Sequence, residues 1–97
     1  MIVISYTKNS IQLSGHAGQA QKGKDIVCAG VSAIFFGSLT WFKAKDIRLN
    51  YNKKTNAVKL ELVNKTKTNQ SYIALIVKQL KPMAYDFKKY IKLSKGK

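Results

Sequence analysis

The chain contains one cysteine, Cys28, and one histidine, His16, both within the stretch SGHAGQAQKGKDIVCAGVS at residues 14–32. A thiol and an imidazole are the minimum set for nucleophilic acyl transfer, because the imidazole takes the thiol proton and returns it to the leaving amine. The alternative is a buried structural cysteine beside an ordinary surface histidine. Spacing in the sequence does not show that the two side chains meet, so both interpretations stay open.

Cys28 is predicted to lie in the first turn of a helix that begins near Asp25, a residue type favoured at helix N-caps. The free backbone N–H groups and the helix dipole at such a position stabilise a thiolate, and the amides around Cys28 are candidates for an oxyanion hole. Ser32 follows Cys28 by four residues, which places Asp25, Cys28 and Ser32 in one sector of the helix. We interpret Asp25 first as a cap and Ser32 as a polar residue at the edge of the core.

The elements around this helix follow from the hydrophobic pattern. Alternation with period two predicts two β-hairpins, residues 2–6 with 10–15 and residues 47–52 with 57–63. In the second hairpin, one face is predicted to carry Ile47, Leu49 and Tyr51 together with Val58, Leu60 and Leu62. The polar, glycine-containing segment 16–24 is predicted to be a loop. Helical periodicity predicts a first helix from Asp25 to residues 43–44, and its core face is formed by Val27, Val31, Ile34, Phe35, Trp41 and Phe42.

The C-terminal third is predicted to add a polar loop at 64–70, a helix over 71–90 that breaks or kinks at Pro82, and a short strand over 90–94. The order ββαββα(β) implies an α+β two-layer sandwich, in which two helices pack on one sheet of four to five strands. A chain of 97 residues is expected to form a single domain, 1–97, with one modest core.

Other classes of protein are disfavoured by composition. Residues 26–42 carry no charge, but this stretch has only the minimum length for a membrane span and contains glycine, serine and threonine, so we interpret it as a buried helix and expect no membrane association. The opening MIVIS lacks the basic stretch and the length of a signal peptide. A single cysteine fits a reducing compartment and offers no zinc-ligand set, so we expect a cytoplasmic protein without metal or other cofactor.

The chain is strongly basic: 18 Lys and Arg against four Asp and Glu give a net charge of +14. Such a field favours polyanions, with nucleic acid or a ribosome surface as the natural partner. Lysine accounts for all but one of these bases, the exception being Arg48, and specific readers of bases or phosphates usually favour arginine. The charge therefore indicates either RNA affinity or a bias in composition.

The motifs GHAG, at 15–18, and GKDIVCAGVSAI, at 23–34, resemble the signature of the ribosomal-processing cysteine protease family, often called Prp. The similarity extends more loosely along almost the whole chain. The resemblance implies that Cys28 is the nucleophile and His16 the general base, with supporting roles for Asp25 and Ser32. It also implies that a glycine-rich loop, with Gly15, Gly18 and Gly23, closes over a peptide substrate.

Members of this family remove a short N-terminal extension from large-subunit ribosomal protein twenty-seven, after an aromatic–aromatic–alanine type sequence. The resemblance therefore implies a cysteine endopeptidase that acts on the N-terminal peptide of a ribosomal protein, works as a homodimer and needs no cofactor. Two alternatives remain from the residues. One is a non-catalytic, ribosome-associated RNA-binding domain that uses the lysine-rich surface with Tyr51, Tyr72 or Tyr90 as stacking groups. The other is a structural partner protein with an inactive site.

Overall fold

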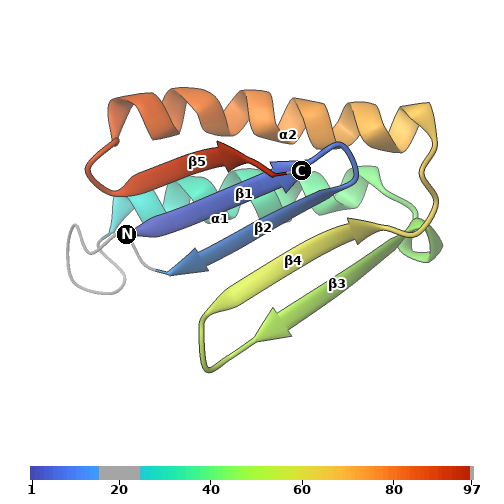
Figure 1. The fold of residues 1–97 in the computed structure, drawn as a ribbon, viewed down its shortest axis with the longest axis horizontal. Helices are drawn as coiled ribbons and strands as arrows, with labels where there is room; N and C mark the ends of the chain where they lie inside the picture. Colours follow the sequence, from blue (N-terminus) through green and yellow to red (C-terminus); the bar gives the residue numbers. More distant parts are fainter. Residues whose placement is uncertain (16–24, 97) are drawn as a thin grey trace.

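Two helices pack on one face of a five-stranded sheet in the computed structural model, which describes residues 1–15 and 25–96 (Figure 1). The order along the chain is ββαββαβ, as predicted, and the fold class is α+β. The strands are β1 (Ile2–Thr7), β2 (Ser10–Gly15), β3 (Ile47–Asn52), β4 (Ala57–Leu62) and β5 (Ile91–Lys95), and the helices are α1 (Ile26–Ser38) and α2 (Lys67–Asp86).

The spatial order of the strands is β3-β4-β2-β1-β5. Neighbouring strands are antiparallel except β1 and β5, which run parallel. Both predicted hairpins are confirmed: β1 pairs with β2 and β3 pairs with β4. The predicted facing of the second hairpin is also confirmed, because Leu49 lies opposite Leu60 and Tyr51 opposite Val58.

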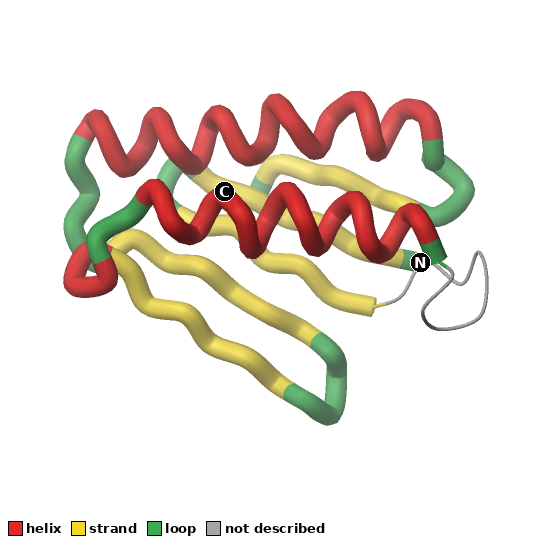
Figure 2. The backbone as a smooth tube through the Cα atoms, turned by 180° about the vertical axis from the view of Figure 1, so that it is seen from behind, coloured by secondary structure: helices red, strands yellow, loops and turns green. Residues whose placement is uncertain are grey.

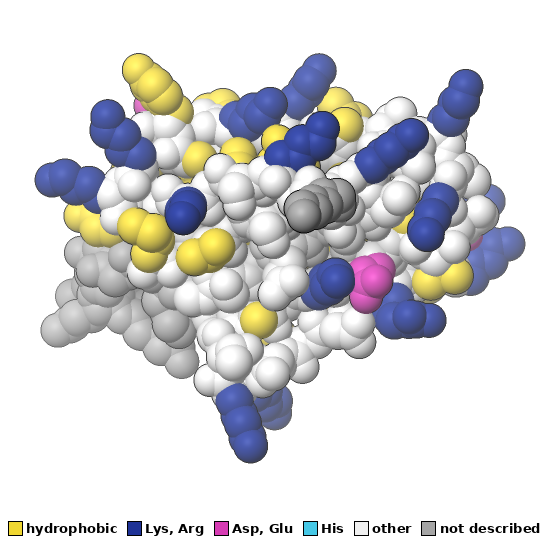
Figure 3. All heavy atoms as spheres, viewed as in Figure 1, with side chains coloured by type: hydrophobic (Ala, Val, Ile, Leu, Met, Phe, Trp, Pro, Cys, Tyr) yellow, Lys and Arg dark blue, Asp and Glu magenta, His cyan; other side chains and the backbone are white. Residues whose placement is uncertain are grey.

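The core lies between the sheet and the two helices, as the view from behind shows (Figure 2). Alternate strand residues point into it, and α1 and α2 close it with their apolar faces; its fully buried members are Ile4, Ile11, Val27, Phe35, Leu60, Ile73, Ile76 and Leu80. The helices approach closely at Gly30, where a Cβ would stand 2.7 Å from the terminal methyl of Met83. The opposite face of the sheet is open, and most of it is white in Figure 3, the colour of the backbone and of side chains that are neither charged nor hydrophobic.

The predicted end of the first helix is wrong. The α-helix ends at Ser38, and two 3₁₀ turns follow, η1 (Leu39–Trp41) and η2 (Ala44–Asp46). The Ser38 hydroxyl donates to the Ile34 carbonyl at 2.6 Å, and such a side-chain hydrogen bond competes with the backbone hydrogen bonds of the helix. Trp41 is 39% exposed and does not join the core face. Within residues 1–15 and 25–96, no helix has the length and apolar character needed to cross a bilayer.

The second helix starts earlier than predicted and continues through Pro82. Thr66 caps it by accepting from the Asn69 N–H at 3.1 Å, so α2 begins at Lys67, inside the segment predicted to be a loop. The helix reaches Asp86 without the predicted break at Pro82, because its buried face packs on the sheet and on α1. The last strand is confirmed as β5, one residue later than predicted.

A buried carboxylate joins these elements at the end of the sheet that is distant from the start of α1. Asp46 accepts hydrogen bonds from the side-chain amides of Asn64 and Asn69, each at 3.3 Å. Its backbone carbonyl also accepts from Val63 N–H and Asn64 N–H. These bonds tie η2 to the β4–α2 connection, so α2 is held at a fixed position against the sheet.

Candidate active site

Cys28 lies in the first turn of α1, where Asp25 caps the helix as predicted. The Asp25 Oδ1 accepts hydrogen bonds from the N–H groups of Val27 and Cys28, both at 3.0 Å, and the Ala29 N–H donates to the Asp25 carbonyl at 3.1 Å. Three N–H groups of the first turn are therefore satisfied by one residue. The cap fixes the backbone that carries the thiol.

The same bonds correct the expectation of an oxyanion hole built from the amides around Cys28. The N–H groups of Val27 and Cys28 already donate to the carboxylate of Asp25. An oxyanion would have to displace that carboxylate before it could accept from either group. In this arrangement the two amides hold the helix terminus in place.

The cysteine sits at the boundary between core and solvent. Cys28 is half-buried and packs against the core, whereas Ser32, one turn later, is exposed. Phe36 follows after another turn and is 48% exposed. Residues spaced by four lie on one face of a helix, so the thiol, the hydroxyl and an aromatic ring form a stripe along α1.

The structure thus places Asp25 and Cys28 at the N-terminal end of α1, and Ser32 one turn after Cys28, near the middle of the helix. Of the other predicted site residues, His16, Gly18 and Gly23 lie outside the described residues. Among the residues that are described, no three His, Cys, Asp or Glu side chains cluster as metal ligands would.

Gly15, the last residue of β2, is adjacent in sequence to His16 and has a structural requirement of its own. Its φ is +84°, a region that side chains disfavour, and a Cβ built there would overlap the carbonyl oxygen of Met1. The end of β2 and the start of α1 lie at the same end of the molecule in both backbone views (Figures 1 and 2). Gly15, the residue before His16 in the sequence, therefore determines the backbone conformation at the end of β2.

Asn56 is a residue near this end that the sequence interpretation missed. It stands in the β3–β4 turn with a φ of +52°, and its side-chain amide donates to the Gly15 carbonyl at 3.2 Å. Its Oδ1 accepts from the Tyr51 hydroxyl, also at 3.2 Å. The turn thereby holds the end of β2. Asparagine before an apolar strand is a turn signal, but a contact across 41 residues has no local signature.

A sequence model of the family described as cysteine protease Prp matches residues 1–92 of this chain. The chain belongs to the Prp family. The chain is thus a cysteine protease, a hydrolase of peptide bonds. The resemblance seen in GHAG and GKDIVCAGVSAI is confirmed at the level of the family.

Two similar proteins of the Prp family come from mycoplasmas. The ribosomal processing cysteine protease Prp of Mycoplasma pneumoniae is 36% identical over 91 residues, which cover 94% of this chain and 91% of that protein. The corresponding protease of Mycoplasma genitalium is 37% identical over 91 residues, covering 94% and 92%.

The fold also matches solved structures of the Prp family. A crystal structure of the ribosomal processing protease Prp from S. aureus, in complex with a covalently linked product peptide, aligns with a TM-score of 0.88 and 24% identity. The alignment covers 99% of this chain and 100% of that chain. A second structure of that protease, with a substrate peptide, gives a TM-score of 0.81 at 23% identity. At this level of identity the likeness concerns the fold.

Proposed function

We propose that this Prp-family protease removes the N-terminal extension of large-subunit ribosomal protein twenty-seven, with Cys28 as nucleophile and His16 as general base. The observation that carries the proposal is the position of Cys28, half-buried in the capped first turn of α1. Here the Asp25 cap fixes the thiol at the boundary between core and solvent, and the adjacent surface is accessible to a peptide. Gly15, which precedes His16 in the sequence, is the last residue of β2 and lies at the same end of the molecule as the start of α1 (Figure 2).

The dyad is tested by alkylation of the single thiol. Iodoacetamide at neutral pH should modify Cys28 of the wild-type protein faster than free cysteine, because an activated nucleophile has more thiolate character. The His16→Ala variant should react at a rate close to that of free cysteine. A wild-type rate no greater than that of free cysteine would remove the basis for an activated thiol.

The substrate is proposed to follow the exposed stripe along α1. Phe36 lies eight residues after Cys28, about 12 Å along the helix axis, and an extended peptide covers that distance in roughly four residues. The aromatic residues of an aromatic–aromatic–alanine sequence lie up to two residues, about 7 Å, before the alanine, so their rings would have to extend along α1 to contact Phe36 while the alanine lies at the thiol. Ser32 lies between them on the same face and is proposed, with Asp25, to support the site.

Substrate choice is tested with a matched pair of peptides. One carries an aromatic–aromatic–alanine sequence followed by the mature N-terminus, and the other has serine in place of the two aromatic residues. We expect the first to be cleaved after alanine with a higher kcat/KM than the second. Equal cleavage of both peptides would contradict aromatic recognition.

A homodimer in the cytoplasm is a further part of the proposal. The helix-covered side of the sheet extends beyond the helices at β3, where Leu49 is 44% and Tyr51 58% exposed (Figure 2). Apolar surface of this kind on a small protein favours a protein partner, and we assign it to a second copy of the chain. Sedimentation velocity should give the mass of a dimer for the wild-type protein and a monomer for Leu49→Lys. A monomeric wild-type protein would contradict this assignment.

We also include contact with RNA through the basic surface, supported by the net charge of +14. Two of the three tyrosines predicted to stack on bases have other roles. Tyr72 packs its ring against Trp41 and Phe42, at centroid distances of 5.8 and 5.4 Å. Tyr90 is half-buried against the core. Tyr51 is 58% exposed but belongs to the surface assigned above to the dimer, so we propose the contact with RNA on another surface.

A further inference from the structure

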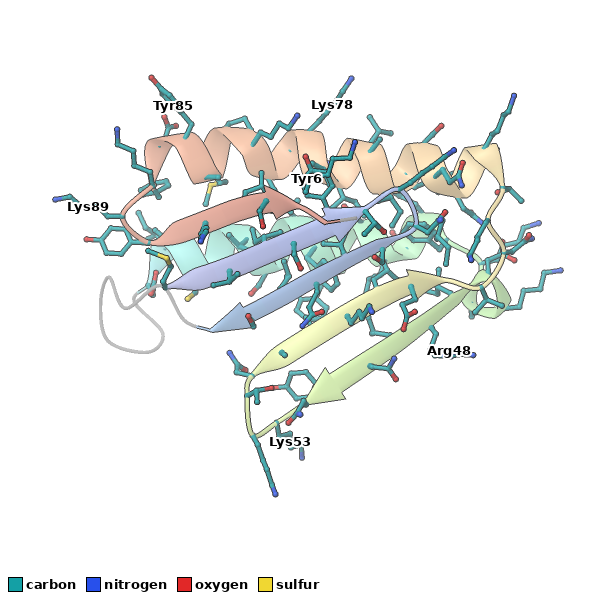
Figure 4. All side chains as sticks on the ribbon, in the orientation of Figure 1. Tyr6, Arg48, Lys53, Lys78, Tyr85 and Lys89 are labelled. Atoms are coloured by element: carbon teal, nitrogen blue, oxygen red, sulfur yellow. The ribbon has the colours of Figure 1, made fainter. Side chains whose placement is uncertain are left out.

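A cleft of about 330 Å³ opens between α2 and the C-terminal ends of β1 and β5. It lies at the far end of β1 from Gly15, because β1 begins opposite Gly15 and its last residues line the cleft. Tyr6 at the end of β1 and Lys78 on α2 stand on its two sides (Figure 4). The cleft is therefore separate from the end of the molecule that carries Cys28.

Four lysines from three separate segments line the cleft. Lys8 comes from the β1–β2 turn, Lys78 and Lys81 from successive turns of α2, and Lys95 from the end of β5. All four side chains are exposed, and Figure 3 shows Lys and Arg side chains gathered along the α2 edge of the molecule. The fold thus brings together cations that are distant in the sequence.

The described residues include all four acids of the chain, Asp25, Asp46, Glu61 and Asp86, and none of these acids lines the cleft. Asp25 caps α1 at the opposite end of the fold. Asp46 is buried and accepts hydrogen bonds from Asn64 and Asn69, so its carboxylate is not part of the cleft although Asn69 is next to Gln70 of the lining. No carboxylate within the cleft therefore offsets the charge of its four lysines. Four ammonium groups around one concave site attract an anion with several charges more strongly than the same charges spread over a flat surface.

The interior of the cleft is apolar, and this property favours one class of polyanion over another. Ile73 and Val77 are buried members of the core, Ala74 lies between them, and the half-buried Tyr6 provides an aromatic ring. An acidic peptide would satisfy the lysines but leave this interior unfilled. A single-stranded nucleic acid offers both parts, because its phosphates pair with lysine while an unstacked base contacts apolar and aromatic side chains.

We propose that this α2–β5 cleft binds single-stranded RNA, with one base inserted against Tyr6 and neighbouring phosphates held by Lys8, Lys78, Lys81 and Lys95. The proposal rests on the RNA contact stated under the proposed function and does not depend on peptide cleavage. It places RNA on a surface separate from the peptide path along α1. One protein molecule can therefore hold RNA and cleave a peptide at the same time.

The test compares two variants with equal loss of charge. The cleft variant replaces Lys8, Lys78, Lys81 and Lys95 by glutamine. The control variant replaces four exposed lysines near β3 by glutamine, namely Lys43, Lys45, Lys53 and Lys54. Lys53 lies at the tip of the β3–β4 turn, at the opposite edge of the molecule (Figure 4). Glutamine keeps most of the side-chain length and the helix propensity, and thermal unfolding verifies that both variants fold.

The binding of a short fluorescein-labelled single-stranded RNA is measured by anisotropy over a series of KCl concentrations. We expect the cleft variant to lose at least about tenfold in affinity for the RNA. The slope of the logarithm of its binding constant against the logarithm of the KCl concentration should become shallower by about 0.7 for each lost phosphate contact. The control variant should lose less than about threefold. Equal losses in the two variants would overturn the proposal, because they would show binding to diffuse charge.

Two further measurements distinguish insertion of a base into the cleft from attraction by charge alone. Tyr6→Leu keeps an apolar side chain but removes the aromatic ring, and it should weaken RNA binding about fivefold, since one stacked base contributes on that scale. Oligoglutamate should compete poorly with the RNA; competition at equal charge concentration would overturn the assignment to nucleic acid. Cys28→Ser should bind RNA as the wild-type protein does, so a failure of the protease proposal is distinguishable from a failure of this one.

Discussion

Replacement of Asp25 by alanine removes both hydrogen bonds from its Oδ1 to the N–H groups of Val27 and Cys28. Loss of an N-cap costs about 0.5–2 kcal/mol of the free energy of unfolding. In a domain of this size 1 kcal/mol corresponds to a Tm change of roughly 4–8 °C. At the typical loss of about 1 kcal/mol, we expect Asp25→Ala to lower Tm by about 4–8 °C. We also expect it to lower kcat/KM, because the first turn carries the thiol.

Asp25→Asn is the matched control. Asparagine keeps the accepting oxygen and caps helices about as well as aspartate, and it loses only the favourable charge at the helix N-terminus, about 0.3–1 kcal/mol. Thermal unfolding followed by circular dichroism should place its Tm between those of the wild type and Asp25→Ala. An unchanged Tm in Asp25→Ala would refute the capping argument. An asparagine variant with wild-type Tm and no cleavage would assign Asp25 a role in the chemistry beyond the cap.

Three further substitutions test the surroundings of the site. Gly15→Ala forces a side chain into a positive φ and against the Met1 carbonyl, so its free energy of unfolding should fall by more than about 2 kcal/mol in urea titration; wild-type stability would show that the position tolerates a side chain. Asn56→Asp places an acceptor against the Gly15 carbonyl, so its free energy of unfolding should fall by about 1–3 kcal/mol in the same assay. This loss should exceed that of Asn56→Gly. The reverse order would show that the hydrogen bond contributes little. Phe36→Ala should raise KM for the aromatic peptide with little change in kcat or Tm, and an unchanged KM would remove Phe36 from the peptide path.

Local patterns are sufficient to predict most elements of this fold. Period-two alternation places both hairpins and the facing of Leu49 and Tyr51, because successive side chains of a strand point to opposite faces of the sheet. Asp25 marks the start of α1 because its side chain can satisfy the N–H groups of the first turn. The start of α2 has a similar local signal in Thr66, but the polar character of the residues that follow it resembles a loop.

Other features depend on contacts that are distant in the sequence. The end of α1 is set by the Ser38 hydroxyl and by packing of Phe42, so helical periodicity alone extends the helix too far. The parallel pairing of β5 with β1 and the contact between Asn56 and Gly15 join segments that no local pattern relates. The lysine cleft has the same origin, because its cations come from three separate segments that only the fold brings together.

Cys28 is proposed above as the nucleophile of a protease that matures a ribosomal protein. The most direct test incubates the precursor of large-subunit ribosomal protein twenty-seven with the wild-type protein and with Cys28→Ala, and reads the product masses by mass spectrometry. We predict loss of the N-terminal extension with the wild-type protein, and an intact precursor with a Cys28→Ala variant of unchanged fold. Cleavage at the wild-type rate by Cys28→Ala would contradict the claim.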